Sequence, residues 1–148
     1  MAYYFIFPET DTTLYSHPDR SSMNAGGDEI LEIVKERGST DNRLYPTRIL
    51  VKFNNEDIQD VFENKIKSSS YSASLQLTAA EPKNLVSTLN LELFTLSQSF
   101  DEGTGRYSNL PTSSNGASWK FRNNTTVATE WATSSFGDGS TGSIDPTI

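Results

Sequence analysis

The residues best suited to chemistry lie in one short loop, Ser99 to Gly105, which contains two adjacent carboxylates and two glycines. Its backbone carbonyls, together with Asp101, Glu102 and Thr104, could hold Ca²⁺, which prefers several hard oxygen ligands in a flexible cage. The same carboxylates could instead cap N–H groups of a turn, and we favour that interpretation. Neighbouring carboxylates in a turn point in different directions, so we do not expect them to form a catalytic acid and base.

Other metal and catalytic sites lack the residues that they need. The chain has one histidine, His17, and no cysteine. A zinc or iron site requires several such ligands, and a serine triad would have to use this single histidine. We therefore expect no catalytic residues, no cofactor apart from the calcium ion considered above, and a protein that is not an enzyme.

Aromatic side chains form the other candidate site, because their apolar ring faces can stack on sugar rings. Ala117, Trp119 and Phe121 alternate onto one face of a predicted strand, so core packing is the better interpretation for Trp119 and Phe121. Tyr107 and Trp131 lie in less regular surroundings. These two residues remain the candidates for glycan binding.

Composition narrows the class of partner. The chain has 148 residues, enough for one domain with a two-layer core, and a formal net charge of −7. Binding to a phosphate backbone needs a basic face, so we expect no direct contact with nucleic acid. Met1 to Phe7 is apolar for only a few residues and lacks a basic leader, which predicts a first strand and neither a signal peptide nor a membrane span.

Alternating side chains predict the strands that would position these sites. Ser72 to Ala79 and Leu89 to Leu96 alternate polar and apolar residues, the period of a strand with one buried face. Arg48 to Phe53 is the densest apolar run, and we place it at the centre of a sheet. Further strands are predicted at Thr12 to Tyr15, Ile30 to Lys35, Ala117 to Arg122 and Val127 to Thr133. The pattern indicates an all-β chain, folded as an antiparallel β-sandwich.

The remaining segments complete the predicted domain. Tyr3 to Phe7 is expected to be an edge strand, because Pro8 cannot donate to a central ladder. One short helix is predicted over about 55–67, capped by Asn54 and followed by acidic residues in its first turn. Residues 1–133 are predicted to form one domain. Residues 134–148 are rich in Gly, Ser and Thr, which indicates a flexible tail or the start of a missing C-terminal part.

The order of these segments resembles the DNRLRE domain family, a jelly-roll-like group of β-sandwiches in surface and carbohydrate-associated proteins. The matching pieces run along nearly the whole chain: Asp11 to Leu14, Asn24 to Gly26, Ile30 to Ile33, Arg48 to Phe53, Ala73 to Leu77, Leu89 to Leu96, Ser99 to Gly105, Ala117 to Arg122 and Trp131 to Thr133. The chain has Phe100 where that family usually shows Trp. The family also continues past the region of Trp131 into further strands. The resemblance implies a jelly-roll-like sandwich that here would need strands from elsewhere.

The chain as a whole, including its aromatic start and the run from Phe7 to Ser16, also resembles virion structural proteins of contractile-tailed phages that infect marine cyanobacteria, although no defined motif carries this resemblance. This resemblance implies a non-enzymatic virion protein that assembles through exposed sheet edges and tail contacts with itself or with neighbouring capsid, neck or tail proteins. The interface candidates are Tyr3, Tyr4, Phe5, Phe7, Phe136 and Ile144. A carbohydrate-binding module that recognises surface glycans is the alternative.

Overall fold

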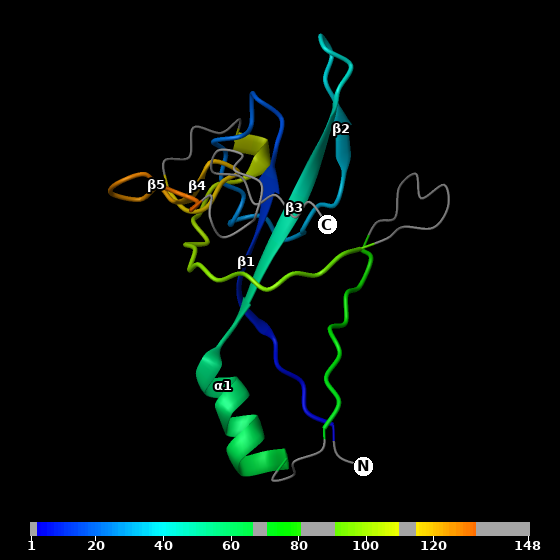
Figure 1. The fold of residues 1–148 in the computed structure, drawn as a ribbon, viewed down its shortest axis with the longest axis vertical. Coiled ribbons are helices and arrows are strands. Elements are labelled where there is room, and N and C mark those ends of the chain that lie inside the picture. Colours follow the sequence, from blue (N-terminus) through cyan, green and yellow to red (C-terminus); the bar gives the residue numbers. More distant parts are fainter. Residues whose placement is uncertain (1–2, 67–70, 81–90, 110–114, 133–148) are drawn as a thin grey trace.

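The computed structural model describes residues 3–66, 71–80, 91–109 and 115–132. Its regular structure is mainly strand, with one short helical segment and two small antiparallel sheets (Figure 1). The prediction of a β-rich chain with a single short helix is therefore confirmed. The predicted tail, with Phe136 and Ile144, lies outside the described residues.

The larger sheet has three strands, β1 (Pro8–Tyr15), β2 (Lys35–Arg37) and β3 (Leu44–Phe53). Their order is β1-β3-β2, and both pairings are antiparallel. β3 contains the apolar run Arg48 to Phe53, so the prediction that this run is central is confirmed. Its β-branched and aromatic side chains fit a pleated, half-buried surface. β1 and β3 form the long ribbon in the middle of the molecule (Figure 1).

The helix begins where β3 ends. The side chain of Asn54 accepts a hydrogen bond from the backbone N–H of Glu56 at 2.7 Å, as predicted for an N-cap. α1 (Asn55–Asp60) then continues as a π-helical segment, Val61–Ile66. The ring of Phe62 lies 4.7 Å from that of Tyr71, between ring centroids, which joins this helical end to the segment 71–80.

The smaller sheet pairs β4 (Phe121–Asn123) with β5 (Thr129–Glu130), both shorter than predicted. A short 3-10 helix, Tyr107–Asn109, precedes them. The main core joins the two sheets through four buried residues, Leu14, Leu50, Ala117 and Trp131, and three partly buried ones, Leu96, Phe100 and Trp119. Core packing of Trp119 is thereby confirmed.

Two predicted strands are wrong in position. Tyr3 to Phe7 is not a strand, and β1 begins only at Pro8. The physical reason is that β3 ends at Phe53, where the chain turns into α1, so β3 does not extend alongside residues 3–7. The strand predicted over Ile30 to Lys35 is reduced to β2, which starts at Lys35. Just before β2, the N–H of Val34 donates to the Thr47 hydroxyl at 2.8 Å, while the backbone N–H of Thr47 donates to the carbonyl oxygen of Val34 at 2.9 Å.

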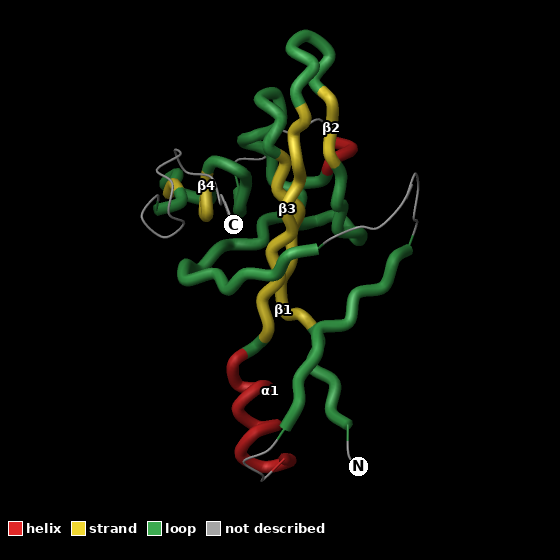
Figure 2. Tube along the Cα trace, turned by 45° about the vertical axis from the view of Figure 1, so that its right-hand side comes forward, coloured by secondary structure: helices red, strands yellow, loops and turns green. Residues whose placement is uncertain are grey.

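The two alternating segments that the sequence assigned to strands are not strands in the single chain. Residues 71–80 and 91–96 contain no strand, and residues 89 and 90 lie outside the described part of the chain. Residues 91–100 cross the β1–β3 ribbon in both views, whereas 71–80 starts near the N-terminal segment and then leads away from the ribbon (Figures 1 and 2). Five apolar side chains on these segments are exposed: Leu75, Leu77, Leu91, Leu93 and Phe94. Four of them, the leucines, belong to the faces predicted to be buried, whereas Leu96 on the opposite face of the second segment packs against the core.

Among the residues that the structure describes, no helix has the length and apolar character needed to cross a membrane.

Candidate functional site

The loop with the candidate calcium ligands is organised by one buried side chain, Asn24. Its Nδ2 atom donates to the carbonyl oxygens of Glu102 at 2.6 Å and Ala117 at 2.8 Å. Its Oδ1 atom accepts from the backbone N–H of Gly105 at 2.8 Å. The side chain is 1% exposed. Asn24 therefore ties together three segments that are far apart in the sequence, and sequence reasoning did not assign it that role.

Two glycines allow the backbones to approach this closely. Gly103 has a φ of 79°, in the left-handed region that favours glycine. At Gly26 a Cβ atom would lie 2.0 Å from the carbonyl oxygen of Glu102. In the sequence, this contact between distant loops is indicated only by the turn-forming residues of Asn24-Ala25-Gly26-Gly27.

The three candidate calcium ligands point to three different partners. Glu102 Oε1 accepts from the backbone N–H of Asp11 at 2.9 Å. Thr104 Oγ1 accepts from Asn115 at 2.8 Å. The Asp101 carboxylate accepts from Thr125 at 3.5 Å. Within the described ranges, no group of three or more His, Cys, Asp or Glu residues is placed to hold a metal ion. Neither carboxylate caps an N–H group of its own turn in these contacts: Glu102 binds a backbone N–H on β1, and Asp101 binds a threonine hydroxyl.

Burial raises the pKa of Asp11, and the negative charge of Glu102 raises it further. Between the ordinary value of 3.8 and the raised value, folding takes up a proton, so the free energy of unfolding falls as pH rises through that window. Asn does not ionise and removes this penalty. We expect Asp11→Asn to raise the free energy of unfolding at neutral pH and to change it little below 3.8, as measured by urea unfolding.

A matched control is Asp57→Asn, because Asp57 is exposed on α1. It should bring no gain in stability at neutral pH. An equal gain from both variants would show that reduced net charge, and not the contact between Asp11 and Glu102, is responsible.

The aromatic candidates occupy different environments. Trp131 is 2% exposed, and its Nε1–H donates to the carbonyl oxygen of Ser118 at 2.9 Å. Its ring lies in the core and exposes no face to solvent. The expectation that this ring stacks on a sugar is therefore wrong. The physical reason is that the segment before Trp131 pairs with β4 and places the indole beside Leu14 and Leu50.

Tyr107 is partly exposed, but other side chains already contact its ring. The guanidinium carbon of Arg20 lies over the ring, 4.8 Å from its centroid. The ring of Tyr15 lies 5.4 Å away on a tilted plane. Burial, with a hydrogen bond to Glu32, raises the pKa of the Tyr15 hydroxyl and keeps it protonated. Arg20 also forms an ion pair with Glu36. This cluster lies at one end of the sheet, and although Tyr107 is 38% exposed, its ring already contacts Arg20 and Tyr15.

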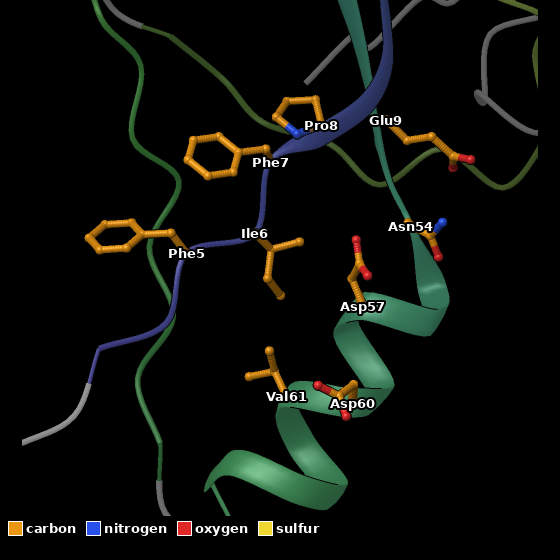
Figure 3. Close-up of a pocket in the computed structure, with 9 residues that line it drawn as sticks. All are labelled: Phe5, Ile6, Phe7, Pro8, Glu9, Asn54, Asp57, Asp60 and Val61. Atoms are coloured by element: carbon orange, nitrogen blue, oxygen red, sulfur yellow. The ribbon is translucent and has the colours of Figure 1, made fainter.

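The aromatic residues of the N-terminal segment, in contrast, are open to solvent. Tyr3, Phe5 and Phe7 are 76%, 76% and 78% exposed, and Tyr4 is 46% exposed. Ile6 points toward α1, whereas Phe5 and Phe7 point to the other side of the segment (Figure 3). The side chains alternate as in a strand, although no strand pairs with them in the described part of the chain.

Comparison with protein families, curated proteins and solved structures finds no match to this chain. Function must therefore be inferred from the geometry of the molecule. The most unusual features of that geometry are the exposed, strand-like segments 3–7, 71–80 and 91–96.

Proposed function

We propose that the chain is a non-enzymatic structural protein of a tailed-phage virion, which self-associates through segments that become strands only when another copy pairs with them. The observation that carries this proposal is the conflict between pattern and environment in residues 71–80 and 91–96. Their side chains alternate as in a half-buried strand, but Leu75, Leu77 and Leu93 are 43%, 50% and 78% exposed.

Exposed strand-like backbone is a template for pairing with another chain. Each leucine side chain that is buried on pairing contributes about 1.5–3 kcal/mol. Several such residues from each copy would have to be buried together to offset the entropy lost on association. Pairing would also add strands to the two small sheets, which is how this chain would complete the jelly-roll-like sandwich that its resemblance to the DNRLRE family implies. Docking on neighbouring capsid, neck or tail proteins would use the same kind of contact.

The experiment is the solution mass of the purified chain across a dilution series, measured by light scattering. We expect the wild-type chain to associate. Leu75→Asp combined with Leu93→Asp should weaken association at least about a hundredfold, because charges replace two leucines that association would bury. Circular dichroism should show an unchanged fold, since neither side chain is buried in the single chain.

Leu44→Asp is the matched control. Leu44 is 53% exposed and lies at the start of β3, away from both segments. Association should persist in this variant. A wild-type chain that stays monomeric at every concentration would refute the proposal.

The carbohydrate-binding alternative has lost the observation that motivated it. Trp131 is buried, and the ring of Tyr107 is in contact with Arg20 and Tyr15. Assembly is therefore the one function that we propose.

A further inference from the structure

An open groove of about 480 Å³ lies between the N-terminal segment and α1 (Figure 3). One wall is the extended chain before and at the start of β1, and the other is one face of the helix. The lining residues are Phe5, Ile6, Phe7, Pro8, Glu9, Asn54, Asp57, Asp60 and Val61.

The two walls of the groove differ in chemistry. Ile6 and Val61 approach each other from opposite walls and form an apolar floor (Figure 3). Asp57 and Asp60 project from the helical wall on the same side (Figure 3). A side chain inserted between the two walls would contact Ile6 and Val61, with the carboxylates of Asp57 and Asp60 beside it.

The extended wall also offers backbone hydrogen-bonding groups. In the parts of the chain that the structure describes, no ladder pairing involves Phe5, Ile6 or Phe7. Because side chains alternate along an added strand, its residues would face α1 and the solvent side in turn. Those on the helix side would meet Asp57 and Asp60, and those on the other side would lie beside Phe5 and Phe7.

Charge decides which strand fits. Glu9 pairs with Lys52 at 3.2 Å and Asp60 with Lys65 at 3.7 Å, whereas Asp57 has no ion pair with any described residue. Asp57 is thus the lining carboxylate that no described cation neutralises, in a chain whose net charge is −7. Another copy would bring the same excess of negative charge to this surface, which opposes its entry.

We propose that this groove binds an extended segment of a different protein, in which basic residues alternate with apolar ones. The inference rests on the proposed role in assembly and assigns a second contact surface, separate from the self-associating segments. The segment would add as a strand beside Phe5 to Phe7, with its cations toward the helix and its apolar residues toward the two phenylalanine rings.

The test uses isothermal titration calorimetry with two short synthetic peptides, one alternating lysine and valine and one alternating glutamate and valine. We expect the full chain to bind the lysine peptide and not the glutamate peptide. Asp57→Asn combined with Asp60→Asn should weaken binding roughly three- to tenfold, the range for two partly exposed charge pairs. Methylation of the backbone nitrogens of the lysine peptide should abolish binding, because it removes the ladder donors.

Glu56→Gln combined with Glu63→Gln is the control for net charge, since these two acids lie on the same helix but do not line the groove. It should change binding less than twofold. Equal binding of the two peptides, or equal losses in the two double variants, would overturn the inference. A rise in solution mass of the Asp57/Asp60 variant would also overturn it, since the groove would then accept a second copy. A chain that binds the lysine peptide but stays monomeric refutes only the proposed self-association.

Discussion

Replacement of Asn24 by alanine is expected to lower the free energy of unfolding by about 3–5 kcal/mol. The substitution removes two donated hydrogen bonds, to Glu102 and Ala117, and two accepted ones, from Gly105 at 2.8 Å and Gly26 at 3.3 Å. The groups left behind lie at a buried junction, where each unsatisfied polar group costs about 1–3 kcal/mol. Urea unfolding measures the change.

Asn115→Ala is the matched control, because its amide donates to Thr104 at an exposed position. Its cost should stay below about 1 kcal/mol. Asn24→Asp gives a second comparison, because it keeps an acceptor for Gly105 but loses the donor to both carbonyls. A cost for Asn24→Ala no larger than that for Asn115→Ala would contradict the view that Asn24 holds the loops together.

Replacement of Trp131 by alanine is expected to cost about 3–5 kcal/mol of stability. The indole packs against Leu14, Leu50 and Ala117 and joins the two sheets. Its removal leaves a cavity and also leaves the carbonyl of Ser118 without its donor. The same urea unfolding measurement applies.

Tyr107→Ala provides the comparison, because Tyr107 is the other aromatic residue first considered for sugar binding. It is 38% exposed and contacts Arg20 and Tyr15 only at the edge of the fold. Its cost should be about 1–2 kcal/mol. If both variants cost the same, Trp131 is not the central core residue that its burial indicates.

Local signals in the sequence predicted the elements that depend on neighbouring residues. Arg48 to Phe53 is a dense apolar run, and it lies in the central strand β3. Asn54 with the acids that follow predicted the start of the helix, and the cap is present. These predictions succeed because strand and helix starts are set by residues within one or two turns.

The alternating segments show why the other strands could not be predicted. The alternation in residues 71–80 and 91–96 predicts which side chains would share a face of a strand, but it does not predict which strand would pair with them. Pairing depends on where another strand lies, and none of the strands in the described ranges pairs with them. The same holds for Tyr3 to Phe7, which loses its neighbour when β3 turns into α1.

The junction at Asn24 was out of reach for a different reason. Its partners Glu102, Gly105 and Ala117 are 78 to 93 positions away in the sequence. An asparagine before alanine and glycine predicts a turn, and nothing local indicates that its side chain will bind distant loops. The burial of Trp131 is likewise a property of the packed sheets and not of the short strand β5 that precedes it.

Hydrogen–deuterium exchange of the wild-type chain tests the central claim most directly, because it reports on the backbone amides of residues 71–80 and 91–96. At concentrations where light scattering finds the monomer, these amides should exchange rapidly, since no strand pairs with them. At concentrations where the chain associates, exchange in residues 71–80 and 91–96 should slow, while exchange in β3 should stay unchanged. Association without protection of either segment would contradict the account.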